Sequence, residues 1–599
     1  MKKTIPKRSQ IEHKYTWALE DLYPSAKAFE ADLKTLAAYP KTITEFSGTL
    51  QTSGEALYRW FVFSDELSLL LEKILVYASR LSDTDTANQQ YQAMKGKALS
   101  LLVQIQGSVS FARPEIMAIP ESVLDGFYQA FPKLERYRRA LEEIRRLRPH
   151  VLSEPEEKLL ALAGEMADSP DTIGNMFRNA DLKFPDAVDQ DGNRHPLTQG
   201  SFVPLLQSQD RTLRKSAFET LYHTFRQFEN TTAAILDAQI KQLRFFAGAR
   251  NYSSTLEAAL TANDIPTAVY HNLIASVRSH MAPMHRYMAL RKKLLGLSEL
   301  HMYDLYVPMV AEADETISYE AAQKLALRAL APLGEDYLSI VRQAFENRWI
   351  DVYENQGKCS GAYSSGARPH PYILLNHKDT LNCAFTLVHE MGHAMHSYLS
   401  MQRQPVVYSD YVIFVAEVAS TVNEVLLMQH LLRTTDDRRK RAYLVNYFLE
   451  QFRTTLYRQT MFAEFELRIN QLSEQGETLT AEVLNSLYQK LNQDYYGDGV
   501  VLDSEIASEW ARIPHFFYNF YVFQYATGFS AAIAIAMRIL KEGEPAVKDY
   551  LQFLSSGSSL DPIGLLNIAK VDMSDTKPID AALSLFDGLI TQLEELLSA

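Results

Sequence analysis

Residues 385–399 read FTLVHEMGHAMHSYL and contain the pattern His-Glu-x-x-His at positions 389–393. Apolar residues recur at positions 388, 391, 395 and 399, which predicts a helix that is buried along one side. His389 and His393 share one face of this helix, about 6 Å apart along its axis. Two imidazoles at that spacing can bind one metal ion, and Glu390 between them can reach a water molecule beside the ion. The stretch therefore predicts half of a zinc hydrolase site.

A surface helix with two solvated histidines is the simpler interpretation, and the neighbouring residues argue against it. Phe385, Leu387 and Val388 extend the apolar surface, where polar groups need partners. His396 also follows, but it stands about 10 Å along the axis from His389, whereas a zinc–nitrogen bond is only about 2 Å long. We therefore interpret His396 as a structural histidine or as part of the wall of the site.

A catalytic zinc ion typically takes a third protein ligand, which must come from another segment. Residues 411–433, YVIFVAEVASTVNEVLLMQHLLR, predict a strongly apolar helix with Glu417 and Glu424 on one face. A carboxylate in such surroundings is unfavourable unless it is paired or bound to a metal ion. Either glutamate can be the ligand, and the other can then orient a ligand histidine by accepting a hydrogen bond from its free N–H. The spacing alone leaves this choice open.

Several separate stretches resemble one family of enzymes. The sequences HEMGHAMHS at 389–397 and FVAEVAS at 414–420 resemble the thimet oligopeptidase/neurolysin family of zinc metallopeptidases, and within it the bacterial oligoendopeptidase F branch. Further similarity lies in YTW at 15–17, DLY at 21–23, GAYSSG at 361–366, PYILLN at 371–376 and the segment from RIPH at 512–515 to QYATG at 524–528. The resemblance therefore runs from near residue 10 to near residue 580.

The resemblance implies the ligands of one zinc ion per chain and the general base. His389, His393 and Glu417 would bind the ion, and Glu390 would take the proton from a water molecule that attacks the peptide carbonyl. Glu424 stays a candidate for orienting a ligand histidine. Zinc is the expected metal, although manganese or cobalt could occupy the same ligands.

The resemblance also implies residues that stabilise the transition state and bind substrate. His515 and the tyrosines after it, Tyr521 and Tyr525, would donate hydrogen bonds to the oxyanion. Neurolysin-like members carry a tyrosine where this chain has Phe529, so the choice among Tyr518, Tyr521 and Tyr525 stays open. The residues expected to contact substrate are Gly361, Ala362, Tyr363 and Tyr518. A peptide could add by main-chain hydrogen bonds to the edge of the strand predicted at 371–376.

Residue type and periodicity predict a mainly α protein with one small sheet near the site. Helical stretches are expected at 66–106, 134–147, 231–247 and 429–472, and a hairpin at 182–198 with Asp191-Gly192-Asn193 as its turn. We place an N-terminal helical region at 1–200 and the catalytic metallopeptidase region at 201–599. The resemblance implies that these regions form a neurolysin-like fold around a deep channel, which would admit short unfolded peptides.

The composition excludes several other classes of protein. The net charge is −13 and both signs are interspersed, which disfavours nucleic acid as a partner. We expect neither a secretory signal nor a membrane span, because no apolar run of sufficient length is present. The two cysteines, Cys359 and Cys383, indicate no disulfide framework. These features favour the cytoplasm.

Three functions fit these observations to different degrees. The main hypothesis is a cytoplasmic zinc endopeptidase that cleaves short oligopeptides. A zinc carboxypeptidase could use the same motif, but it would not cut a peptide blocked at both ends. A helical peptide-binding protein with a degenerate site is the third, and the intact set of two histidines and two carboxylates argues against it.

Overall fold

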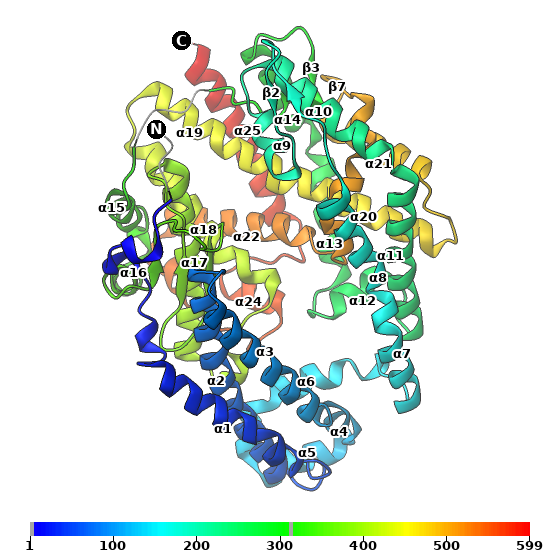
Figure 1. Cartoon of the computed structure of the whole chain (residues 1–599), viewed down its shortest axis with the longest axis vertical. Helices are drawn as coiled ribbons and strands as arrows, with labels where there is room; N and C mark the ends of the chain where they lie inside the picture. Colours follow the sequence, from blue (N-terminus) through cyan, green and yellow to red (C-terminus); the bar gives the residue numbers. More distant parts are fainter. Residues whose placement is uncertain (1–4, 311–315, 599) are drawn as a thin grey trace. The chain divides into compact units, whose positions relative to one another are not determined.

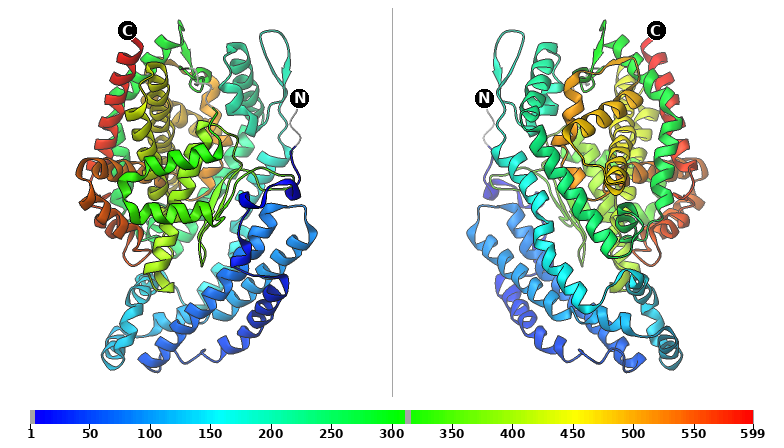
Figure 2. Two further views of the ribbon diagram at one scale, coloured as in Figure 1. Left: turned by 90° about the vertical axis from the view of Figure 1, so that its left-hand side faces the viewer. Right: turned by 90° about the vertical axis from the view of Figure 1, so that its right-hand side faces the viewer.

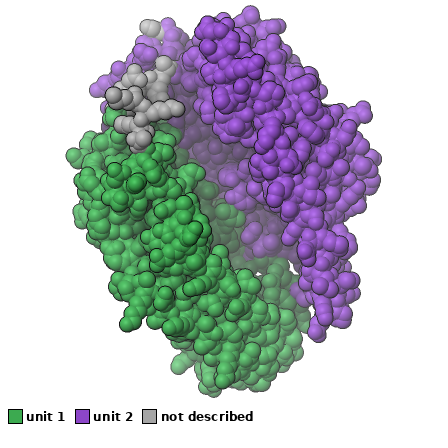
Figure 3. Space-filling view, viewed as in Figure 1, with its two compact units in different colours: residues 1–149, 315–430, 535–571 green, residues 150–314, 431–534, 572–599 purple. Residues whose placement is uncertain are grey.

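The computed structural model describes residues 5–310 and 316–598, and its regular structure is almost entirely helical (Figure 1). Contacts divide the chain into two compact units (Figure 3). Unit 1 comprises residues 1–149, 315–430 and 535–571, and unit 2 comprises residues 150–314, 431–534 and 572–599. The predicted mainly α fold is confirmed. The predicted division of the chain near residue 200 stays a prediction.

Unit 1 contains a layer of N-terminal helices that lie side by side (Figure 2). Its helices are α1 Ala26–Thr44, α2 Gly54–Thr84, α3 Gln89–Val109, α4 Ala112–Ala118, α5 Glu121–Ala130, α6 Arg138–Arg146, α15 Tyr319–Ala329, α16 Glu335–Glu346, α17 Leu381–Arg403, most of α18 Ile413–Thr434, α23 Glu544–Leu554 and α24 Pro562–Ile568. The stretch predicted as helical at 66–106 is two helices, because the side chain of Asn88 caps a new helix by accepting from the N–H groups of Gln90 and Tyr91.

The small sheet of unit 1 has the strand order β4-β6-β5. β4 Ile350–Asp351 pairs in parallel with β6 Tyr372–Leu374, and β5 Tyr363–Ser365 pairs with β6 antiparallel. The strand predicted at 371–376 is therefore confirmed as β6. The expectation that a peptide adds to its edge is wrong, because β6 is the central strand and both of its edges are paired. The edge strand on the antiparallel side is β5.

The N-terminal arm, the described residues before α1, contacts this sheet. Trp17 is buried, and its indole N–H donates to the carbonyl of Ile373 at 2.7 Å. Asp351 of β4 is fully buried between the guanidinium of Arg8 and the ammonium of Lys358. A buried carboxylate is stable only with such partners, so the arm and the sheet depend on each other.

Unit 2 is also helical and contains the expected hairpin. Its helices are α7 Glu154–Ala167, α8 Ser169–Met176, α9 Gln199–Leu206, α10 Arg211–Arg226, α11 Glu229–Ala249, α12 Thr255–Thr261, α13 Thr267–Ser279, α14 Met281–Leu294, α19 Arg438–Gln451, α20 Arg458–Glu474, α21 Ala481–Tyr496, the first part of α22 Phe523–Glu542 and α25 Lys577–Ser598. β1 Ala187–Val188 pairs antiparallel with β2 Arg194–His195, which confirms the hairpin. β3 Leu300–His301 pairs in parallel with β7 Val500–Val501.

Among residues 5–310 and 316–598, one helix is long and apolar enough to cross a membrane. It is α22, whose most apolar window has a mean hydropathy of 1.3 and is 72% buried. A buried core helix can have the same length and composition, so α22 is only weak support for a membrane span.

Candidate active site

The His-Glu-x-x-His motif lies in the interior turns of α17. The side chain of Thr380 caps the helix by accepting from the Cys383 N–H, and Val388, Met391 and Met395 form its buried face. This burial confirms the apolar stripe predicted from the sequence. The stripe fixes the rotation of α17, so that His389 and His393 lie together on another face.

Three predicted ligand residues come together at the contact between α17 and α18. The Nε2 atoms of His389 and His393 lie 3.5 and 3.6 Å from Oε2 of Glu417. One donor atom from each of the three residues lies within 4.8 Å of the other two. Two ligands held at about 2 Å on a tetrahedral ion are about 3.3 Å apart. The donor set therefore fits one small divalent cation.

Glu424 contacts the opposite side of the His389 ring. Its Oε1 accepts a hydrogen bond from Nδ1 of His389 at 2.6 Å. This bond places the Nδ1 proton, so that Nε2 is the nitrogen that faces Glu417. The two glutamates on one face of α18 thus differ in position: Glu417 lies between the two histidines, and Glu424 lies behind one of them.

Gly392 allows α17 and α18 to approach this closely. A Cβ atom at residue 392 would lie 2.5 Å from both the Ala419 carbonyl oxygen and the Ser420 Cα. Asn423 reinforces the crossing, because its side chain donates to the Val388 carbonyl at 3.0 Å. Only glycine fits between these backbones, and the close approach is what brings Glu417 to the histidines.

Glu390 is buried beside the donor set. Its side chain is 6% exposed, and its Oε2 has no hydrogen-bond partner in the described part of the chain. Burial raises its pKa to about 7, with the charges of Glu417 and Glu424 adding to the effect, while His389 and the backbone of Ser364 lower it. A carboxyl group with a pKa near neutrality is suited to general-base work.

The three histidines of α17 have different electrostatic surroundings. Burial opposes charge on His389, but the hydrogen bond and charge of Glu424 raise its pKa to about 9, with smaller contributions from the other two glutamates. Burial and the neighbouring His389 lower the pKa of His393 to about 4. His396 is buried, its ring stacks on Tyr411 at 3.7 Å between centroids, and burial lowers its pKa to about 3. It lies outside the donor set.

The predicted substrate-contacting residues of unit 1 lie on and before the edge strand β5. Gly361 has φ of +81°, a conformation that favours glycine, and its carbonyl accepts from the side chain of Asn376 at 2.9 Å. Ala362 follows it, and Tyr363 begins β5 with its hydroxyl bound to Asp83 at 2.6 Å. The tyrosine hydroxyl therefore anchors the strand, while the backbone of Ser364 lies next to Glu390.

The predicted transition-state residues form one aromatic cluster in unit 2. The His515 ring lies 5.6, 6.4 and 6.1 Å from the rings of Tyr518, Tyr521 and Tyr525. His515 is half-buried, and burial lowers its pKa, so the imidazole is neutral at neutral pH. Phe529 is buried against Phe452 at 5.0 Å and belongs to the core instead.

Sequence reasoning missed the residues that position the site. Gly392 lies inside the motif, and a glycine in the interior of a buried helix indicates that another backbone packs closely against it. Asn423 carried a weaker sign, an amide in a strongly apolar helix. Ser364 gave none, because its contribution is a backbone group.

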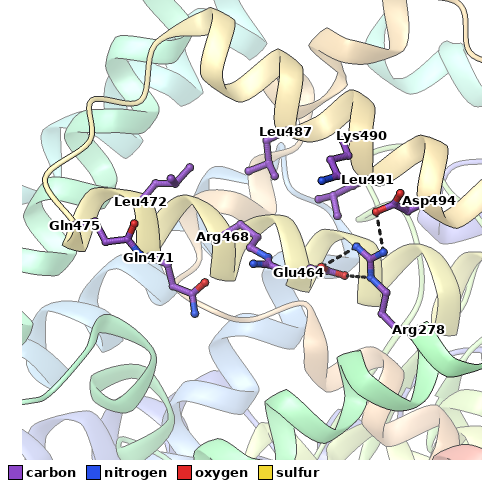
Figure 4. Close-up of a pocket in the computed structure, with 10 residues that line it drawn as sticks. All are labelled: Arg278, Glu464, Arg468, Gln471, Leu472, Gln475, Leu487, Lys490, Leu491 and Asp494. Atoms are coloured by element: carbon purple, nitrogen blue, oxygen red, sulfur yellow. Dashed lines mark hydrogen bonds and ion pairs between the residues drawn. The ribbon is translucent and has the colours of Figure 1, made fainter.

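A separate pocket of about 470 Å³ lies in unit 2 along α20 and α21 (Figure 4). Arg278 lines the pocket, and its guanidinium donates to Glu464 and Asp494, which also line it, at 2.8 Å. The remaining lining consists of Arg468, Gln471, Leu472, Gln475, Leu487, Lys490 and Leu491. None of the predicted site residues lies in it.

Comparison with known proteins gives matches over the whole chain. Residues 204–585 match the Peptidase family M3 model, and residues 115–184 match the Oligopeptidase F model. The chain is 46% identical over 594 residues to oligopeptidase PepF of Bacillus subtilis, covering 99% of this chain and 89% of that protein. It is 42% identical over 593 residues to group B oligopeptidase PepB of Streptococcus agalactiae, covering 99% and 98%.

A solved structure agrees with these matches. The crystal structure of oligoendopeptidase-F from Enterococcus faecium has a TM-score of 0.75 and 39% identity, and the match covers 96% of this chain and 99% of that one. Similarity at this level over nearly the full length extends to both fold and family. The chain therefore belongs to peptidase family M3 and is a metalloendopeptidase related to oligoendopeptidase F.

Proposed function

We propose that the chain is a zinc-dependent endopeptidase that hydrolyses internal bonds of short, unfolded oligopeptides, with Glu390 as general base. The observation that carries this proposal is a buried carboxyl oxygen of Glu390 that has no partner among the described residues and lies beside three converging donor atoms. An unpartnered buried polar atom is costly, and a water molecule in the site would be its natural partner.

His389, His393 and Glu417 would hold the ion, with Glu424 orienting His389. Two imidazoles and one carboxylate are a donor set that zinc accepts, and they leave further coordination positions open. The bound ion would supply Lewis acidity, polarising the scissile carbonyl and lowering the pKa of a water molecule. Glu424 would increase the basicity of His389 as a ligand, because its carboxylate accepts the Nδ1 proton.

Glu390 would move the proton during hydrolysis. Its carboxylate would accept a proton from the attacking water and then donate it to the nitrogen of the leaving amine. Burial raises the pKa of Glu390, which favours acceptance of the proton from water. This route requires no nucleophilic serine or cysteine.

His515 and the tyrosines of its cluster would stabilise the tetrahedral oxyanion. A neutral imidazole N–H and a phenol O–H are both hydrogen-bond donors, and donors aimed at a developing negative charge lower the barrier most strongly in dry surroundings. The structure supports this role by gathering the four rings. Among the tyrosines, Tyr521 and Tyr525 are the proposed donors, and Tyr518 is proposed to contact substrate.

The substrate would bind in extended form along β5. An edge strand offers unpaired main-chain groups, which recognise peptide backbone with loose sequence preference. The positive φ of Gly361 and the side chain contact of Tyr363 fix the approach to this edge. A peptide paired here would pass Ser364, whose backbone lies beside Glu390. We propose short peptides of the cytoplasm as the substrates.

Mapping the products of a peptide blocked at both ends tests this function. An endopeptidase cuts such a peptide internally and releases two fragments that mass spectrometry identifies. A carboxypeptidase would leave the blocked peptide intact and shorten the unblocked one from its C-terminus. Binding without turnover by metal-loaded protein would instead favour a peptide-binding role.

A further inference from the structure

Residues 515–525 form the segment that carries His515 and its tyrosines. Two consecutive residues of this segment have backbone angles in the left-handed region. Asn519 has φ of +52° and Phe520 has φ of +56°. Asparagine adopts this conformation fairly often, but a bulky aromatic residue rarely does. Phe520 therefore needs contacts elsewhere in unit 2 that hold its backbone.

Glu466 of α20 supplies the backbone contact. The N–H of Phe520 donates to Oε1 of Glu466 at 2.6 Å, and the glutamate side chain is 1% exposed. The Phe520 ring is buried as well, and it packs edge-on against Tyr270 at 5.6 Å. The amide and the ring of one residue are thus both held by helices of unit 2.

The same helix also holds the start of the segment. Phe516 is fully buried against Phe462 and Phe465 of α20, at 5.5 and 4.9 Å between ring centroids. The carbonyl of Phe517 accepts from the side chain of Gln239 at 3.2 Å. The buried residues of this segment act as anchors, whereas His515, Tyr518, Tyr521 and Tyr525 keep exposed surface.

Glu466 differs from the neighbouring acid in its partners. Glu464 binds Arg278 through two hydrogen bonds of 2.8 Å. Glu466 accepts from the amide of Phe520, and its Oε2 is unpartnered among the residues that the structure describes. Burial raises its pKa to about 8, against the lowering effect of the Phe520 N–H. Burial thus favours the uncharged acid, for which glutamine is a close substitute.

We propose that Glu466 is a positioning residue for the transition-state cluster. By accepting the Phe520 N–H it fixes the turn between His515 and Tyr521, and so holds the imidazole and the phenol groups in one arrangement. This inference rests on the proposed function of His515 and its tyrosines.

Three substitutions separate positioning from general stability. Glu466→Gln keeps an oxygen acceptor, and we expect its kcat to stay within about twofold of wild type. Glu466→Leu removes the acceptor, and we expect kcat to fall about 10- to 100-fold with KM nearly unchanged, because the cluster acts in the transition state. Glu464→Gln is the matched control, because Glu464 is a buried acid that does not contact the segment 515–525. We expect the Tm of this variant to fall while its kcat stays near wild type. Glu466→Ala serves in place of leucine if the leucine variant does not fold.

His515→Ala and the double variant with Glu466→Leu complete the test. If both residues act as one unit, the double variant is no slower than His515→Ala alone. If His515→Ala lowers kcat but neither Glu466→Leu nor Glu466→Ala does, the positioning role of Glu466 is wrong and the role of His515 stands. If His515→Ala leaves kcat unchanged, the proposed function of the cluster fails and the positioning role with it. Equal losses of kcat in Glu464→Gln and Glu466→Leu would also contradict positioning.

Discussion

Gly392 of α17 lies against Ser420 of α18 so closely that a Cβ on residue 392 would be 2.5 Å from the Ser420 Cα. The missing side chain lets two helix backbones touch at the point where the three candidate donor atoms meet. The position of Glu417 relative to His389 and His393 is thus set by a packing contact, in addition to the spacing of the motif.

We expect Gly392→Ala to damage the metal site through this contact. The added methyl group must push the helices apart, at a cost of about 1–3 kcal/mol in the free energy of unfolding. Glu417 would then move away from the histidines and zinc affinity would fall. Chelator competition measures the affinity, and urea unfolding measures the stability.

Gly588→Ala is the control for this substitution. Gly588 is also in a helix, α25, but a Cβ added there would have nothing within 4 Å of it. Alanine at this position should leave metal affinity unchanged and raise stability by about 0.5–1 kcal/mol. Unchanged affinity in Gly392→Ala as well would contradict the role of the close crossing.

Glu424 should affect metal affinity without being a ligand. Glu424→Ala removes the acceptor of the His389 Nδ1 proton, and we expect zinc affinity to fall about 10- to 100-fold. Glu424→Gln keeps one oxygen acceptor and should lose less. Glu417→Ala removes a proposed ligand, so it should lose far more. Titration with a fluorescent zinc indicator ranks the three variants, and the order Glu424→Ala worse than Glu417→Ala would show that the two roles are reversed.

Removal of the metal should abolish activity and leave the fold. The donor residues lie on α17 and α18, whose apolar faces are buried in the core. We expect a chelator to stop peptide cleavage while the far-ultraviolet circular dichroism stays helical. Added zinc should restore the rate, and added manganese or cobalt tests the tolerance of the site. Full activity in protein shown to be free of metal would exclude a metal-dependent mechanism.

The stability of unit 2 should fall at acid pH because of Glu509. Burial alone would raise its pKa, but the charges of Arg458 and Arg512 and the hydrogen bonds from Arg458 and Tyr488 lower it to about 2. The unfolded carboxyl, with a pKa near 4.5, binds more protons between pH 4.5 and 2, so stability is full above this window and lost as pH falls through it.

Two variants test this ion cluster. Arg458→Met leaves Glu509 buried with less compensation and should cost about 3–5 kcal/mol at neutral pH. Glu509→Gln should remove part of the pH dependence between pH 4.5 and 2. Urea unfolding over a pH series measures the free energy of unfolding of both variants. If Glu509→Gln loses stability at acid pH as steeply as wild type, the effect belongs to other carboxylates.

The sequence predicts the parts of the candidate site that one helix determines. The helical period of α17 placed His389 and His393 on one face, and the apolar surroundings made a metal the better explanation. Spacing alone could not choose between Glu417 and Glu424, because both lie on one face of α18. Their different positions depend on where the two helices cross, which is a tertiary property.

Other features depend on the tertiary structure as well as on the local sequence. The strand at 371–376 was predictable from its residue types, but its central place in the sheet depends on β4 and β5, which are too short to stand out in the sequence. The left-handed turn at Phe520 was hidden, because the residue there is aromatic and not glycine. Glu466 read as an ordinary helical glutamate, and only the fold shows that it binds the Phe520 backbone.

The most direct test of the central claim is the rate at which Glu390→Gln, fully loaded with zinc, cleaves an internally quenched peptide blocked at both ends. Glutamine keeps the size of the side chain but cannot accept the proton, so we predict that kcat falls at least about 10²- to 10⁴-fold. Zinc content and KM should stay near wild type, because the ligands are untouched. Cleavage at the wild-type rate by the zinc-loaded variant would contradict Glu390 as the general base.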